Sequence, residues 1–175
     1  MSVNCEETEV FKHALVTTDG SPLSQVAIAH VPQVVDPTGS VTILQVIDDP
    51  ARVVAKTSAG FEFAMSNAIG LNVVDEIVAG ERLAADVNLG AARRRLQAAG
   101  LKNVEVAVLQ GIPGEVIVSE ALRLHADVVV MATHGRGGLR RTVLGSVTDH
   151  VVRHLPGVPV LLVHPPHEAE LAVEA

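Results

Sequence analysis

Aromatic side chains are nearly absent from this sequence: among 175 residues there are three Phe and neither Trp nor Tyr. A core therefore has to be built from Val, Leu, Ile and Ala, a composition that favours a valine-rich α/β sheet. Basic residues are also few, 13 against 20 acidic ones, which gives a net charge of −7. Because nucleic-acid binding needs a broad basic surface, this charge argues against that class and leaves room only for a local phosphate site.

Cysteine and long apolar runs are scarce as well. The one cysteine, Cys5, cannot form a disulfide within the chain, which suits a reducing compartment. No apolar run approaches the length of a membrane span, and the acidic start lacks the apolar region of a secretory signal. We therefore expect a cytoplasmic protein with one domain at residues 12–164, between a flexible arm at 1–11 and a disordered acidic tail at 165–175.

Five short apolar segments alternate with helical patterns, as in a doubly wound parallel α/β sheet. Ser21 and Pro22 open the first helix, which we expect to last to about Val35. Because Pro159 cannot donate to a ladder, the last strand is expected at the sheet edge. The predicted strands are His13–Thr18, Ser40–Ile47, Val104–Leu109, Val128–Met131 and Val158–Val163.

The middle of the chain is less regular. Asp48 to Asn72 is interpreted as a variable insertion with a short helix, and the alternative is a flap beside a binding site. A long amphipathic helix should follow, in which Gly80 and Gly90 each cost about 1 kcal/mol relative to Ala and make a kink plausible. Its apolar face is predicted to carry Val74, Ile77, Ala84, Val87, Ala91 and Leu96.

The segment from Ala126 to His154 is predicted to be a buried strand, a glycine-rich loop and a helix that begins at Ser146. A glycine loop that leads into a helix N-terminus is suited to bind an anion, because backbone N–H groups and the helix dipole both favour phosphate. Asp19 follows the first strand, so its turn and the loop should meet at the carboxyl edge of the sheet. The glycines are Gly135, Gly137, Gly138 and Gly145, and Ser146 is a candidate cap or ligand.

Other phosphate and catalytic motifs do not fit this loop. A Walker A motif needs Lys before its Ser or Thr, and Ser146 follows Leu144 and Gly145 instead. Arg140 stands where a dinucleotide fingerprint needs its third glycine, and no G-x-S-x-G elbow exists for an esterase. His150 and His154 lack a third ligand at a fitting spacing, so we expect no metal site there. No catalytic residue is evident.

The motifs resemble the universal stress protein family over roughly Lys12 to Val163. Gly135 is followed after nine residues by Gly145 and Ser146, which is similar to the family's G-x2-G-x9-G-[ST] pattern except for Ala132 at the first glycine. The resemblance implies strand order 3-2-1-4-5 and an ATP-binding sensor or partner-binding protein of the stress response, with at most slow ATP hydrolysis. It implies a homodimer through Val158–Val163 and no nucleic-acid or membrane partner.

The resemblance also implies a ligand and a site. The ligand is ATP or another adenine nucleotide, with Mg²⁺ or Mn²⁺ held through its phosphates. Asp19 would hold the adenosine, Val46 would pack on the base, and Ala132 would lie beside the ribose. The alternative is a dimeric interaction module of the same fold that binds no nucleotide. The full implied site is Thr17, Thr18, Asp19, Val46, Met131, Ala132, His134, Gly135, Arg136, Gly145, Ser146 and Val147.

Overall fold

A computed structural model describes residues 11–56, 68–133 and 144–164. Five parallel strands form one sheet in the order β3-β2-β1-β4-β5, which confirms the predicted fold class and places the last strand at an edge. The strands are β1 (Phe11–Thr17), β2 (Val35–Ile47), β3 (Asn103–Gln110), β4 (Val128–Ala132) and β5 (Val160–Val163). The helices are α1 (Pro22–His30), α2 (Pro50–Lys56), α4 (Ala68–Ala98), α5 (Pro113–Arg123) and α6 (Ser146–His154), with a 3₁₀ turn at Val31–Gln33.

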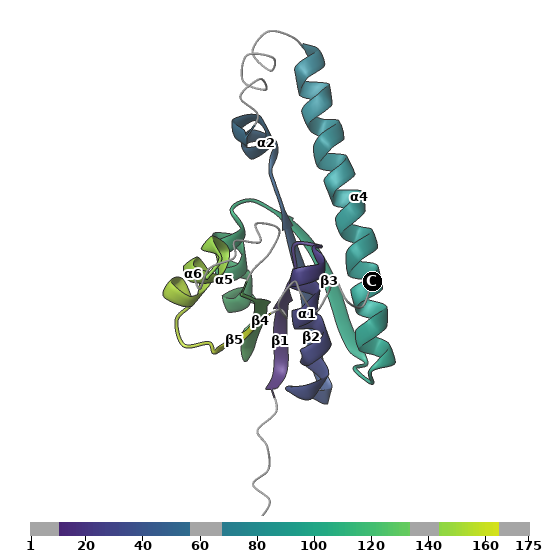
Figure 1. Cartoon of the computed structure of the whole chain (residues 1–175), viewed down its shortest axis with the longest axis vertical. Helices are drawn as coiled ribbons and strands as arrows, with labels where there is room; N and C mark the ends of the chain where they lie inside the picture. The colour runs from purple at the N-terminus through teal and green to yellow at the C-terminus, as the bar shows by residue number, and fades with distance from the viewer. Residues whose placement is uncertain (1–10, 57–67, 134–143, 165–175) are drawn as a thin grey trace, which may run out of the picture.

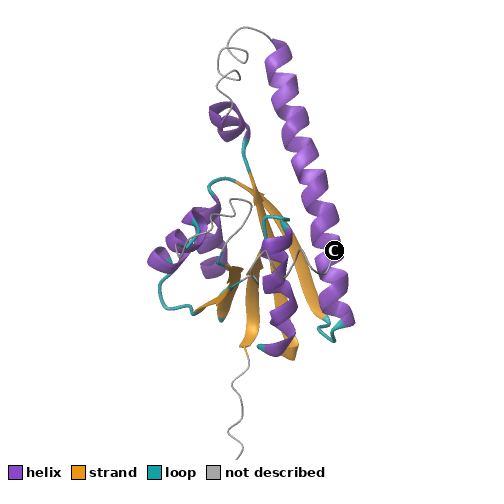
Figure 2. Cartoon of the chain, in the orientation of Figure 1, coloured by secondary structure: helices purple, strands orange, loops and turns teal. Residues whose placement is uncertain are grey.

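Helices cover both faces of the sheet (Figures 1 and 2). Ala14 and Val16 of β1 belong to the core cluster shared with α1 and α4, whereas Leu15 belongs to the cluster shared with α5 and α6. Successive side chains of a strand point to opposite faces, so a strand covered on both sides has to be apolar at every position. This requirement explains the continuous valine run of β4, all of which is buried.

Helix α1 ends earlier than predicted, at His30 rather than near Val35. Pro32 explains this end, because proline has no N–H to continue the helical ladder, and the chain tightens into the 3₁₀ turn instead. The predicted start is confirmed: Ser21 is the N-cap, its side chain accepts a hydrogen bond from the Ser24 N–H, and Pro22 occupies the first turn.

Strand β2 begins at Val35, ahead of the strand predicted from Ser40. Asp36, Pro37 and Gly39 are residue types typical of a turn. The turn chemistry is present within the strand, since Asp36 Oδ1 accepts hydrogen bonds at 2.7 Å from both the Thr38 N–H and the Thr38 hydroxyl. The register between β1 and β2 shifts here, so the segment is a bulge. Gly39 is required at this bulge, because a Cβ atom would lie 2.5 Å from the Lys12 carbonyl oxygen.

Helix α4 is one continuous 31-residue helix through Gly80 and Gly90. Its predicted apolar face was partly wrong. Val74 and Leu96 are buried as expected, but Ile77 and Val87 are 41% and 64% exposed. The residues that α4 buries are instead Val74, Ala85, Leu89, Ala92 and Leu96.

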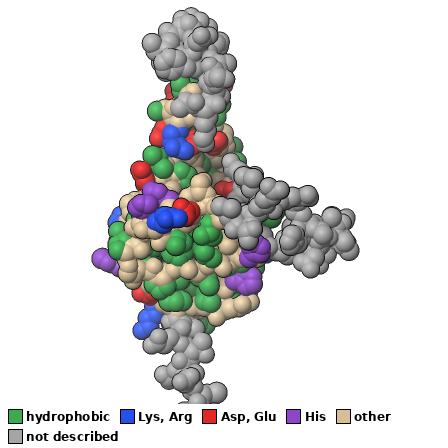
Figure 3. Space-filling view, turned by 60° about the vertical axis from the view of Figure 1, so that its left-hand side comes forward, with side chains coloured by type: hydrophobic (Ala, Val, Ile, Leu, Met, Phe, Trp, Pro, Cys, Tyr) green, Lys and Arg blue, Asp and Glu red, His purple; other side chains and the backbone are tan. Residues whose placement is uncertain are grey.

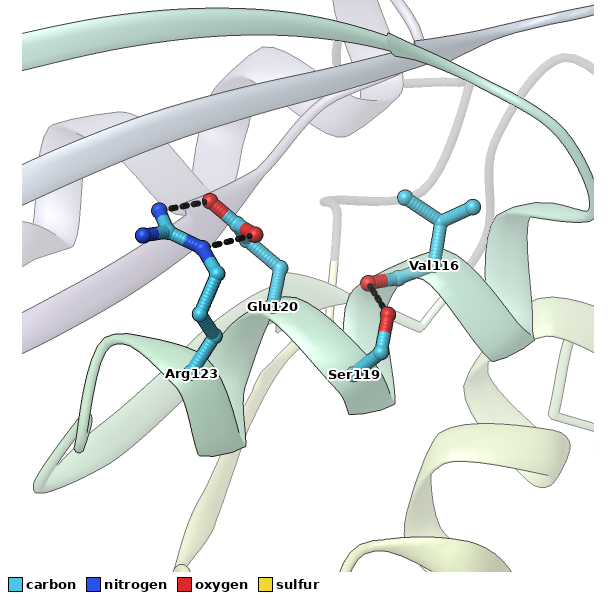
Figure 4. Close-up of polar contacts among 4 residues, drawn as sticks. All are labelled: Val116, Ser119, Glu120 and Arg123. Atoms are coloured by element: carbon cyan, nitrogen blue, oxygen red, sulfur yellow. Dashed lines mark hydrogen bonds and ion pairs between the residues drawn. The ribbon is translucent and has the colours of Figure 1, made fainter.

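An ion pair on α5 makes the stability of the fold depend on pH (Figure 4). The Arg123 guanidinium donates to both Glu120 carboxylate oxygens, at 2.8 and 2.6 Å. These hydrogen bonds lower the pKa of Glu120 below its ordinary value of 4.5, despite the opposing effect of burial. The ion pair therefore stabilises the fold above about pH 4.5, and this contribution is lost as the pH falls through the lowered pKa.

Arg123→Gln is expected to lower the urea midpoint slightly at neutral pH, by an amount typical of a largely exposed ion pair. The difference from the wild type should shrink at an acidic pH below the lowered pKa of Glu120, because the carboxylate is then protonated in both proteins. Urea denaturation followed by circular dichroism at the two pH values measures this. An equal difference in urea midpoint at both pH values would show that the ion pair is not the source of the pH dependence.

Candidate functional site

The candidate site lies at the carboxyl edge of the sheet, where the strand order reverses between β1 and β4. The helices that follow these two strands lie on opposite faces of the sheet, α1 after β1 and α6 after β4 (Figure 2). In doubly wound sheets such a switch point leaves a crevice for a ligand. Asp19 and the start of α6 follow the two strands on either side of the reversal.

The turn after β1 is fixed by a local hydrogen-bond network. The hydroxyls of Thr18 and Ser24, both buried, are 2.8 Å apart, and the Thr18 hydroxyl accepts the Gly20 N–H at 3.0 Å. Asp19 Oδ1 accepts from the Ser21 N–H at 2.9 Å and from the Ser21 hydroxyl at 2.6 Å. This Asx-type turn holds the half-buried Asp19 carboxylate at the sheet edge and at the start of α1.

Gly20 brings this turn close to two amide side chains. Its φ is +81°, a left-handed conformation that favours glycine, and a Cβ there would lie 2.7 Å from Asn88 Nδ2 of α4. Gln45 Nε2 of β2 would be 3.5 Å from the same position. Gln45 is 2% exposed, and among the described residues its Oε1 is the one buried side-chain polar atom that has no hydrogen-bond partner.

The N-terminus of α6 is attached directly to the end of β4. The Gly145 N–H donates to the Thr133 carbonyl at 3.0 Å, and the Thr148 hydroxyl donates to the Ala132 carbonyl at 3.2 Å. The N-cap is Gly145, not Ser146, and it provides no side-chain cap. The first helical N–H to reach a carbonyl of the same segment is that of Asp149, at 2.8 Å from Gly145 O.

Residues 146–148 therefore present N–H groups without an intrahelical acceptor at the positive end of the helix dipole. Ser146 is exposed at this end of α6. An anion that reaches this helix end can accept several N–H hydrogen bonds at once. This is the chemistry that a phosphate group requires.

Helix α6 is held in place from the α5 side as well. A Cβ added at Gly114 would lie 2.6 to 2.9 Å from three atoms of His150, so the two helices pack at close range through this glycine. The rings of His150 and His154 stack with centroids 4.2 Å apart, and His154 Nδ1 lies 2.8 Å from the His150 carbonyl. The described residues contain no group of three side chains suited to hold a metal ion.

The other site residues assigned from the sequence differ in how far they are exposed to a ligand. Thr17, Met131 and Ala132 are buried, and the Met131 side chain packs in the core toward α5 and α6. Val46 is half-buried on that same face. His134, Gly135 and Arg136 lie outside the described residues. The structure adds three polar side chains that the sequence analysis did not assign, Ser24, Gln45 and Asn88; the signal for Gln45 was an amide inside an otherwise apolar strand.

The sequence profile of the universal stress protein family matches residues 11–164. The chain belongs to the universal stress protein family. It is similar to universal stress protein MJ0577 of Methanocaldococcus jannaschii, with 31% identity over 160 residues that cover 88% of this chain and 95% of that protein. The matched residues include the Asp19 turn and all five strands of the sheet.

Solved structures of universal stress proteins share the fold. The structure of MJ0577 covers 91% of this chain and 99% of its own, with a TM-score of 0.71 and 28% identity. Universal stress protein UspA of Lactobacillus plantarum gives a TM-score of 0.72 at 21% identity. The match covers 89% of this chain and 99% of that protein. A universal stress protein solved in complex with cAMP gives a TM-score of 0.59 at 23% identity. The match covers 90% of this chain and 99% of that protein. None of the described helices combines the length and apolar character needed to cross a membrane.

Proposed function

We propose that this universal stress protein family member binds an adenine nucleotide, with ATP foremost, in the crevice between the Asp19 turn and the N-terminus of α6. The observation that carries the proposal is the attachment of α6 to β4 through Gly145 and Thr148, which fixes a row of N–H donors at the switch point. Asp19 provides a carboxylate acceptor on the other side, suited to the hydroxyl groups of a ribose or to an adenine amino group.

The negative net charge of the protein favours a nucleotide that binds together with a metal cation. The chain has a net charge of −7, so a triphosphate approaches an acidic protein. A Mg²⁺ or Mn²⁺ ion bound through the phosphates would reduce this repulsion, and Mg²⁺ commonly binds in this way with few protein ligands. The remaining phosphate charge would be neutralised by the N–H groups and dipole of α6.

Ala132 sets the expected affinity. It replaces the first glycine of the family pattern at the end of β4, and its carbonyl already accepts the Thr148 hydroxyl, which fixes the local backbone. Ala132 is 8% exposed and packs in the core cluster toward α1 and α4, and we propose that its methyl group hinders the approach of a ligand to the end of β4. We propose weakened binding rather than none, and Ala132→Gly provides a variant that should bind more tightly.

The proposed role is that of a nucleotide-dependent sensor or partner-binding protein. The described part of the site offers hydroxyls, backbone N–H groups and the Asp19 carboxylate, whose Oδ1 accepts hydrogen bonds from Ser21, and we propose that none of them acts as a nucleophile or general base. Electrostatic stabilisation by α6 can support slow ATP hydrolysis at most. A turnover in the usual range of kinases, about 1 to 100 per second, would contradict this role.

Ser146 provides a sharp test of the phosphate site. It is the first residue of α6, where proline is well tolerated, and Gly145 before it is extended at φ −57° and ψ 147°, which also suits a following proline. Ser146→Pro thus removes one N–H and the hydroxyl while the helix is retained. Ser146→Ala removes the hydroxyl alone and is the matched control.

Calorimetric titration with Mg²⁺-ATP should show about a tenfold loss of affinity for Ser146→Pro and a smaller loss for Ser146→Ala. Competition with cAMP and AMP in the same titration ranks the adenine ligands. Equal affinities of the proline and alanine variants would remove the α6 N-terminus from the proposed site. Absence of binding heat in the wild type and in Ala132→Gly would favour the nucleotide-free module.

The second candidate function is partner docking through a homodimer, and the edge strand favours it. β5 pairs with β4 on one side, and Val160, Leu161 and Leu162 remain half-buried. Hydrophobic side chains gather on the side of the molecule turned to the viewer in Figure 3. Bare apolar edges promote aggregation, so we propose that Val158–Val163 pairs with a second copy across a two-fold axis.

A further inference from the structure

Helix α4 has an apolar face that its own domain does not cover. The upper part of the helix extends well past the sheet (Figure 1). Four large apolar residues of α4 are exposed, Val73 at 40%, Ile77 at 41%, Leu83 at 68% and Val87 at 64%. Single exposed hydrophobic residues need no explanation, whereas several on one helix face mark an interaction surface.

The spacing of this face is that of a coiled coil. Val73, Ile77, Gly80, Ala84, Val87 and Ala91 are separated alternately by four and three residues, which is the a/d pattern of a heptad repeat. These six residues are called the α4 seam below. The helix buries a different face against its own domain, through Val74, Ala85, Leu89, Ala92 and Leu96. The seam is therefore additional to the contacts that fold the chain.

Gly80 is a second and independent indication. Glycine within a helix costs about 1 kcal/mol relative to alanine. A Cβ atom at Gly80 would meet nothing within 4 Å, so the fold of the single chain gives no reason for this glycine. A glycine in the seam does allow another helix to approach closely, and Ala84 and Ala91 extend the same small surface.

We propose that the α4 seam packs antiparallel against the α4 seam of a second copy. In a two-fold arrangement centred between Ala85 and Asp86, each a position faces a d position of the other copy. Val87 of each copy then packs on Ala84 of the other, and Gly80 packs on Ala91 of the other copy. Ile77 packs on the aliphatic stem of the other copy's Arg94. Large residues thus meet small ones, which is the complementarity that close helix packing needs.

Charge selects the antiparallel direction. Glu76 and Arg94 are both exposed, and the two-fold register places Glu76 of each copy beside Arg94 of the other. A parallel pair would instead place Arg94 against Arg94 and Glu76 near Glu81, which are like-charge contacts. The second copy is therefore favoured in one orientation only. This contact is separate from the β5 edge and does not rest on nucleotide binding.

Reversing the charges of Glu76 and Arg94, singly and together, tests the proposal, because the double reversal should restore the association that each single reversal weakens. Sedimentation velocity over a range of concentrations should show self-association of the wild type without nucleotide. Glu76→Lys and Arg94→Glu should each raise the dissociation constant of the α4 step about tenfold, because each creates two like-charge contacts. The double variant E76K/R94E should return it to within about threefold of the wild type.

Val87→Asp should abolish the same step, and urea denaturation should confirm that each variant remains folded. If β5 also pairs, the variants should remove one assembly step and leave the other. A wild type that remains monomeric, single reversals without effect, or a double reversal no better than its parents would each overturn the proposal. Because no nucleotide is present, the outcome is independent of ATP binding.

Discussion

Asp19→Ala is expected to weaken Mg²⁺-ATP binding by at least about tenfold, since it removes a charged acceptor from one wall of the crevice. The carboxylate lies at the end of β1, where the Ser21 N–H and hydroxyl hold it through Oδ1. A carboxylate is an acceptor to which the hydroxyl groups of a ribose or an adenine amino group can donate hydrogen bonds. Calorimetric titration of the folded variant measures the loss.

Asp36→Ala is the matched control for this substitution. Asp36 has the same turn geometry, with Thr38 in place of Ser21, and these hydrogen bonds lower its pKa. It stands at the start of β2 and therefore at the opposite edge of the parallel sheet. Both variants lose one Asx-type turn, but only Asp19→Ala should lose affinity. Equal losses would indicate a general effect on the fold and not a ligand contact.

Leu15→Ala is expected to lower the free energy of unfolding by about 3 kcal/mol. Leu15 is 0% exposed at the centre of β1, between β2 and β4, and packs in the cluster toward α5 and α6. A cavity there cannot be filled easily, because the neighbouring strands are fixed on both sides by their ladders. Urea denaturation of the purified variant gives the change directly.

Leu122→Ala on α5 serves as the control, because the same atoms are removed from a side chain that is 42% exposed. Its expected loss is within about 0.5 kcal/mol. If the two variants were equally destabilised, Leu15 would not belong to the tightly packed centre of the sheet. If neither changed, the core described for the α5 and α6 face would be wrong.

The fold could be predicted from the sequence because its signals are local and consistent. Val128–Met131 is apolar at every position, as a strand covered on both faces must be, and Pro159 correctly indicated an edge. The boundary of α1 was missed because Pro32 was not weighed as a helix end. Strand β2 was started late because the Asp36 turn signal belongs to a bulge within the strand.

Helix α4 shows where periodicity alone fails. The helix has two apolar faces, and a pattern search cannot decide which one meets the sheet. Val74 and Leu96 were assigned correctly to the core, but Ile77 and Val87 belong to the exposed seam. Only the packing of the whole domain distinguishes a face that folds the chain from one that is free to bind another.

The candidate site could be predicted in outline, since strand ends and helix starts follow from the order of the elements. The structure joins Gly145 and Thr148 of the α6 start to the end of β4, and Asp19 follows β1, the strand next to β4. That these residues form one site stays a prediction. The cap at Gly145 was missed, because Ser is the commoner N-cap residue. The amides of Gln45 and Asn88 were also missed, since their approach to Gly20 depends on how α4 packs over β2.

Mass analysis of the small molecules released when freshly purified protein is denatured tests the proposed nucleotide site most directly. Release of an adenine nucleotide from the wild type, and its loss from Asp19→Ala and Ser146→Pro preparations, is the predicted result. Absence of any adenine nucleotide from the wild type, together with no binding heat on addition of Mg²⁺-ATP, would contradict it.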